Sequence, residues 1–145
     1  MPRLDAGRVA TWRAFGVVAA EMQRRVDAGL VEDYQLPLVW FEILAALQAG
    51  GGSMRVGELC EVLREVPSSL SRRLDRLEEE GFVERVATPT PDDKRAVTVS
   101  LTRDGRAEWR DANITYRRMV QQHFANMLTD TDIAALQRIF SKLGR

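Results

Sequence analysis

The side chains with the clearest chemical use are hydroxyls and guanidinium groups between residues 68 and 76. They are Ser68, Ser69, Ser71, Arg72, Arg73 and Arg76. Small hydroxyls near a helix N-terminus allow close approach to phosphate oxygens, which the helix dipole also attracts. An arginine one or two turns further along has the length and the forked donors to pair with guanine O6 and N7. A spacing of four places Arg72 and Arg76 on one helix face, where they could address neighbouring base pairs or phosphates.

Two further cations, Lys94 and Arg95, lie beside a segment that should project from the fold. No packing role requires a cation there. The DNA minor groove is only ~6 Å wide and admits a single extended arginine, and A/T-rich tracts deepen its negative potential. Asp93 serves either to form the turn or to hold Arg95 extended. The position of these cations favours contact with a nucleic acid.

The overall charge does not by itself indicate a nucleic-acid partner. The chain has 21 basic and 21 acidic residues, and residues 55–103 contain nine basic and ten acidic side chains. On charge alone, the arginines at 72, 73 and 76 would be a solvated helix face offset by acidic neighbours. Lys94 and Arg95 instead favour a nucleic-acid partner, because they lie beside a projecting tip where no core packing requires a cation.

The apolar spacing predicts the helices that present the first group. Residues 55–81 carry two short helical patterns separated by Val66-Pro67-Ser68, which together predict a helix-turn-helix. Leu70, Leu74 and Leu77 of the second helix should face the core. Gly81 is placed where a C-terminal glycine ends a helix.

After Gly81 the apolar period changes from 3.6 to two, which predicts strands at 82–86 and 97–101. The segment 88–94 between them is rich in proline, aspartate and threonine and should form a projecting polar tip. A helix-turn-helix followed at once by a hairpin, here 82–101, is the arrangement of a winged helix.

The N-terminal part should be helical. Apolar residues at steps of three and four predict an amphipathic helix over 8–26, ended by Gly29 and the Asp33-Tyr34 pair. The segment 38–47 is apolar on most faces and predicts a buried helix. Three consecutive glycines then predict a short loop at 50–53.

The C-terminal part should be helical as well. A long helix is expected from Thr102, a plausible N-cap, to about Leu128. The pattern Thr129 to Asp132 resembles a capping box and precedes a last helix over 133–143. The predicted fold is mainly α, of the α+β class, in one domain spanning 1–145.

Composition excludes several classes of function. One cysteine and one histidine leave no cluster with metal-ligand spacing, so we expect no metal, and nothing indicates a cofactor. A glycine-rich phosphate loop is absent, and the paired carboxylates Asp92 and Asp93 lie in an exposed tip, which argues against an enzyme. No apolar run is long enough to span a bilayer and no secretory signal is recognisable, so a cytoplasmic protein without membrane contact is expected.

The sequence from Pro67 to Arg85, together with that from Asp93 to Gly105, resembles the MarR family of winged-helix transcriptional regulators. The second block contains the family's wing signature, with Asp-x-Arg at the tip and Leu-Thr-x-x-Gly opening the next helix. The resemblance covers nearly the whole chain. The chain departs from the family at Arg64 and Glu65, where members have a small and a hydrophobic residue, which leaves the geometry of the turn open.

The resemblance implies a homodimeric regulator, with a repressor favoured, that binds a pseudo-palindromic operator in double-stranded DNA. Residues 6–50 and 103–145 would form the helical dimerisation region, and 54–102 the winged helix-turn-helix. By position, Ser68, Ser69, Ser71 and Arg72 match the family's recognition-helix contacts, and Arg95 matches the wing arginine. Two-fold symmetry then predicts half-sites about one helical turn, ~34 Å, apart.

The resemblance also implies an effector, because many relatives release DNA when a small phenolic or other aromatic acid binds between the dimerisation helices and the winged domain. The candidate walls are Trp12, Phe15, Tyr34, Trp40 and Tyr116, and the candidate donors are Arg13 and His123. Core or dimer packing is the competing role for each aromatic residue.

Two alternatives remain open from the sequence. The chain could be a dimeric winged-helix module that binds proteins instead of DNA. It could also sense oxidants through Cys60, as some relatives do through a thiol in the first helix. Cys60 falls on the apolar face of a helix, however, and a thiol buried among apolar residues holds little reactive thiolate. A core role for Cys60 is therefore favoured.

Overall fold

The computed structural model describes residues 1–144, which form six α-helices, one short 3-10 helix and a three-stranded antiparallel sheet. In chain order the elements are α1 (Ala6–Tyr34), α2 (Leu38–Ala49), β1 (Ser53–Arg55), α3 (Val56–Leu63), α4 (Pro67–Glu79), β2 (Val83–Ala87), β3 (Val97–Leu101), α5 (Arg103–His123), η1 (Ala125–Met127) and α6 (Asp130–Leu143). Strand β3 lies between β1 and β2. The fold is the winged helix-turn-helix that the apolar periods predicted.

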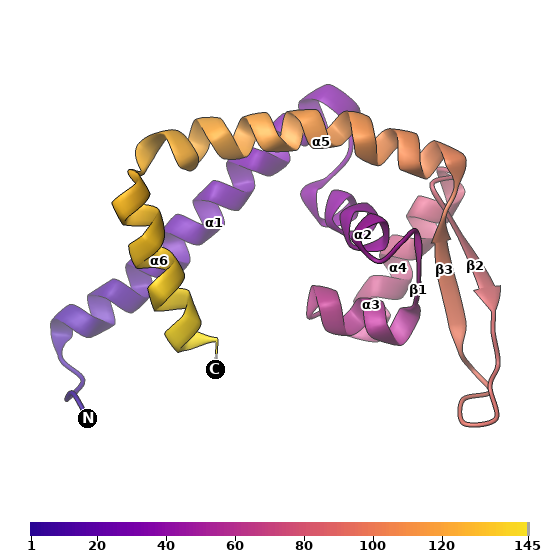
Figure 1. The fold of residues 1–145 in the computed structure, drawn as a ribbon, viewed down its shortest axis with the longest axis horizontal. Coiled ribbons are helices and arrows are strands. Elements are labelled where there is room, and N and C mark those ends of the chain that lie inside the picture. The colour runs from indigo at the N-terminus through magenta and orange to yellow at the C-terminus, as the bar shows by residue number, and fades with distance from the viewer. Residues whose placement is uncertain (145) are drawn as a thin grey trace.

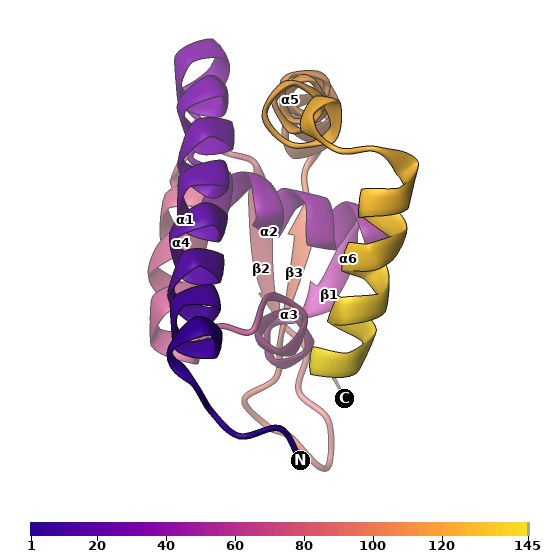
Figure 2. The same cartoon turned by 90° about the vertical axis from the view of Figure 1, so that its left-hand side faces the viewer.

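Helix α5 joins two regions of different character. At one end of α5 the helices α2, α3 and α4 pack with the sheet, and the β2–β3 hairpin projects beyond them (Figure 1). Helix α1 packs against α5, and α6 follows the other end of α5; the side view places α1 and α6 on opposite sides of the molecule (Figure 2). No helix within residues 1–144 combines the length and apolar character needed to cross a membrane.

The core is built around α2, as its dense apolar sequence predicts. Its side chains Phe41, Ile43, Leu44 and Leu47 are fully buried. They belong to one cluster with buried leucines of α3 and α4, namely Leu59, Leu70, Leu74 and Leu77. Full burial of each such side chain contributes roughly 1.5–3 kcal/mol. This core fixes which face of α4 turns inward and leaves the opposite face for binding.

The predicted loop at 50–53 is wrong in one respect, because the chain enters a strand at Ser53. Gly51 and Gly52 adopt φ of 85° and 103°, a region that favours glycine, and form the turn. The Gly52 carbonyl then accepts a hydrogen bond from Leu101 N–H at 2.8 Å, and Ser53 pairs with Ser100 of β3. Three residues are too few to display a period of two, so the sequence pattern did not reveal β1.

Helix α1 passes through Gly29 and ends at Tyr34, so the predicted end at the Asp33-Tyr34 pair is confirmed and the role given to Gly29 is wrong. Gly29 is a packing position: a Cβ atom there would lie 2.6 Å from Cγ of Met119 on α5. Gln35, in the left-handed region at φ 52°, ends the helix: its N–H donates to the Val31 carbonyl, and the following Leu36 N–H donates to the Leu30 carbonyl. The glycine therefore sets the close approach of α1 and α5.

The long C-terminal helix ends earlier than the predicted Leu128. Helix α5 stops at His123, and Phe124 leaves helical geometry at φ −126° before the 3-10 turn η1. The capping box before α6 is confirmed. Thr129 Oγ1 accepts from Asp132 N–H at 3.2 Å, and the Asp132 carboxylate accepts from Thr129 N–H at 2.9 Å. The chain thus changes direction between α5 and α6.

Candidate nucleic-acid interface

Helix α4 presents most of the predicted contact residues on its solvent side. Leu70, Leu74 and Leu77 hold its inner face in the core. The exposed residues are Ser68, Ser71, Arg72 and Arg76, whereas Ser69 is half-buried. The N-cap residue Val66 provides no side-chain acceptor, so the N–H groups of the first turn remain suited to an external acceptor such as phosphate.

The flank of α4 nearest the wing is tied to strand β2 by Arg85. Its guanidinium pairs with Asp75 and, through Nε at 3.3 Å, with Glu78. The Arg85 N–H also donates to the Glu78 carboxylate at 3.1 Å. Hydrogen bonding to Arg85 lowers the pKa of Glu78, and the same bond raises the pKa of Arg85. These contacts tie strand β2 to the C-terminal half of α4.

The opposite flank of α4 is held by Arg73, which forms an ion pair with Glu65. Arg64 adopts the left-handed region at φ 53°, and the Glu65 N–H donates to the Cys60 carbonyl at 3.0 Å. This geometry resolves the question raised by Arg64 and Glu65: the turn closes α3, and Glu65 then reaches α4. The structure therefore separates Arg73 from the exposed cations Arg72 and Arg76.

The Arg73→Met variant tests this separation. Removing the guanidinium leaves the Glu65 carboxylate, which is only 22% exposed, without its ion-pair partner. We therefore expect urea titrations to show a free energy of unfolding lower by about 1–3 kcal/mol. The slope of DNA affinity against salt concentration should stay unchanged, because an arginine held inside the protein releases no phosphate counterion. The comparison variant is Arg76→Met, which removes an exposed arginine of α4. If Arg73→Met reduced the salt slope as much as Arg76→Met does, Arg73 would instead be a phosphate contact.

At the wing tip, Asp93 acts as a turn former. Thr90 N–H donates to the Asp93 carbonyl at 2.8 Å, and Asp93 N–H donates to Thr90 Oγ1 at 2.9 Å. The Asp93 carboxylate accepts from the backbone N–H of Arg95 at 3.0 Å and leaves the Arg95 guanidinium without a bond to it. Lys94 and Arg95 are both exposed.

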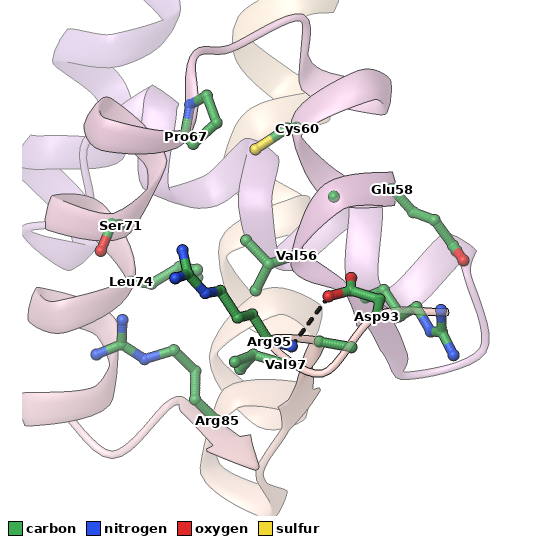
Figure 3. A pocket seen from close by; sticks show the side chains of 13 residues that line it. Val56, Glu58, Cys60, Pro67, Ser71, Leu74, Arg85, Asp93, Arg95 and Val97 are labelled. Carbon is green, nitrogen blue, oxygen red and sulfur yellow. Dashed lines mark hydrogen bonds between the residues drawn. The ribbon is translucent and has the colours of Figure 1, made fainter. Parts of the chain in front are cut away.

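A hollow of about 810 Å³ lies between α3, α4 and the hairpin. Figure 3 shows Ser71 of α4 on one wall, with the Arg95 side chain crossing from the wing toward it. The structure thus brings predicted contact residues of both elements to one hollow. Cys60 also borders the hollow but is only 9% exposed, in keeping with the predicted core role.

The structure separates the predicted effector residues. Trp12, Arg13 and Phe15 are exposed on the N-terminal half of α1, whereas Tyr34 and Trp40 pack against the core. Only Tyr116 and His123 of the predicted set line a smaller pocket, about 210 Å³, between α1, α2 and α5. Sequence reasoning missed its other lining residues, which include Met22, Val26, Leu38, Glu42 and Met119. For Glu42 a signal existed, because it is a lone charge inside an apolar helix.

Known proteins match this chain in sequence. A model for the MarR family matches residues 34–96. The multiple antibiotic resistance protein MarR of Salmonella typhimurium is 33% identical over 118 residues, covering 79% of this chain and 80% of that protein. The HTH-type transcriptional repressor MdtR of Bacillus subtilis is 27% identical, covering 71% of this chain and 64% of MdtR.

Solved structures match the fold. Sco3205 of Streptomyces coelicolor, a MarR family transcriptional regulator in complex with DNA, superposes with a TM-score of 0.88 at 27% identity, covering 99% of this chain and 90% of Sco3205. A MarR mutant from E. coli, complexed with operator DNA, gives a TM-score of 0.81 at 27% identity and covers 98% and 99%.

Proposed function

The chain belongs to the MarR family of transcriptional regulators, and on this premise we propose that it represses transcription by binding a pseudo-palindromic operator as a homodimer. Helix α4 enters the major groove with Ser68, Ser69, Ser71, Arg72 and Arg76, and Lys94 and Arg95 of the wing reach the adjacent minor groove. The observation that carries this proposal is that Ser71 and Arg95 border one hollow. MarR and Sco3205, solved with DNA, support it, as does MdtR by its name as a repressor.

Unpartnered apolar surface on the terminal helices supports the homodimer. The face of α1 that buries Val26 and Leu30 continues toward the N-terminus as Trp12 and Phe15, which are 73% and 50% exposed. Helix α6 has no buried residue, and Phe140 is 48% exposed. A second copy of the chain would cover both surfaces across a two-fold axis. In this proposal residues 6–50 and 103–145 form the dimerisation region.

A small effector in the pocket between α1, α2 and α5 would regulate DNA release. The pocket lies where α1 and α5 meet α2, which packs against α3 of the winged region, so a bound molecule can alter their packing. Tyr116 supplies an aromatic wall and His123 a donor.

The test is DNA binding by Arg72→Ala and Arg95→Ala. Selection from a random duplex pool at a stated salt concentration would first recover the operator. We expect each substitution to weaken operator binding by ~1–3 kcal/mol, with Arg72→Ala relaxing base preference and Arg95→Ala acting on A/T-rich flanks. Arg138→Ala, an exposed arginine on α6, serves as the control and should leave affinity unchanged.

Unchanged affinity in both variants would overturn the proposed contacts. It would favour the alternative of a winged-helix module that binds protein. In such a module the cations of α4 and the wing would not contact DNA phosphates. A recovered site without two-fold symmetry would likewise contradict the homodimeric mode of binding.

A further inference from the structure

Glu42 is the one formally charged residue between Leu36 and Met54. It lies on α2 between Phe41 and Ile43, which are both buried in the core. Glu42 is itself exposed, and it borders the pocket of about 210 Å³ between α1, α2 and α5.

The walls of the 210 Å³ pocket around Glu42 are apolar. Met22 and Val26 come from α1, Leu38 from α2 and Met119 from α5, and Phe124 directly follows α5. The remaining polar groups are Gln23, Tyr116 and His123, and among the described lining residues there is no lysine or arginine. A carboxylate is thus the only formal charge that the pocket offers to a ligand.

The compensation of Glu42 within the protein is incomplete. Glu42 is exposed, but partial desolvation of its carboxylate raises its pKa, and the charge of Arg73 opposes this shift only in part. Arg73 itself is already paired with Glu65. The Glu42 carboxylate therefore keeps the capacity to bind another cation.

We infer that this pocket selects small apolar amines, whose ammonium group pairs with Glu42 while the hydrocarbon part lies among Met22, Val26 and Leu38. The inference rests on the proposed effector site and specifies its ligand. It departs from the aromatic acid that the family resemblance implied, since an anion would face a carboxylate with no arginine or lysine in the lining to offset it.

Three probes of one shape separate charge from hydrophobicity: 2-phenylethylamine, 2-phenylethanol and 3-phenylpropanoate. Isothermal titration of the full chain without DNA should find the amine bound roughly tenfold tighter than the alcohol, and the propanoate weakest, because a partly desolvated ion pair strengthens binding. In Glu42→Gln the amine and the alcohol should bind within about twofold of each other, since the amide keeps the shape and removes the charge. Glu61→Gln, an exposed carboxylate on α3, is the matched control and should retain the preference.

Glu42→Gln should fold normally, because Glu42 is exposed and the amide keeps its shape, and a thermal melt checks this. Tighter binding of the propanoate, equal binding of all three probes, or no binding at millimolar concentration would each overturn the inference. Operator affinity, measured separately, distinguishes the two proposals. Amine binding without any effect on DNA would refute the effector role and leave the ligand class intact.

Discussion

Gly105→Ala is expected to lower the free energy of unfolding by about 3 kcal/mol. Gly105 lies in the first turn of α5, where a Cβ atom would overlap the Phe82 carbonyl oxygen and come within 2.9 Å of the carbonyl carbon. That oxygen accepts the Thr102 N–H at 3.0 Å, and Thr102 in turn caps α5 by accepting from Gly105 N–H. Backbone on both sides of the contact is therefore fixed and cannot move aside for a methyl group.

The sign of this effect is informative because helix propensity points the other way. Alanine is favoured over glycine inside a helix by about 1 kcal/mol. Gly57→Ala in α3, where no atom lies within 4 Å of the added Cβ, is the matched control and should be neutral or slightly stabilising. Urea unfolding of both variants measures the difference. Equal stability of the two variants would contradict the close approach of α5 to Phe82.

Phe15→Asp should dissociate the proposed dimer, raising its dissociation constant about 100-fold or more. Phe15 shares a face of α1 with Val26 and Leu30, and the exposed part of that face is the surface assigned to the second copy. An unpaired carboxylate at the centre of such an interface would have to give up its hydration. Sedimentation velocity measures the dissociation, and operator affinity should fall with it because a single protomer contacts only one half-site.

Val17→Asp provides the control within the same helix. Val17 is 70% exposed but lies two residues from Phe15, roughly 200° around the axis, and so faces away from the proposed interface. This variant should remain dimeric. If both variants dissociated, or neither did, the assignment of the interface to the Phe15 face would be wrong.

The winged region could be predicted because its signals are local. The leucines of α4 recur at helical spacing, so its inner and outer faces follow from the sequence alone. The alternation in β3 is equally local. Features that depend on distant partners could not be predicted: Gly29 is explained only by Met119, and β1 only by its pairing with β3.

The residues of the candidate sites also divide into those that local patterns predict and those that depend on distant partners. Exposed residues of α4 follow from the position of its core face, whereas Arg73 falls at the edge of that face and its role depends on Glu65. For the effector residues, aromatic character alone does not show whether a side chain lines a pocket, packs in the core or meets another chain. Trp12 is exposed, whereas Trp40 and Tyr116 both pack against the core and only Tyr116 of the two also borders the pocket.

The bridge from Arg85 to Asp75 and Glu78 has a consequence for the DNA sites that the proposed mode of binding would accept. Because the bridge ties β2 to α4, the distance between the bases assigned to α4 and those assigned to the hairpin would be set within each protomer. A base pair inserted between them, inside a proposed half-site, should therefore weaken binding. An insertion at the centre of the proposed palindrome would instead change only the spacing between the two protomers.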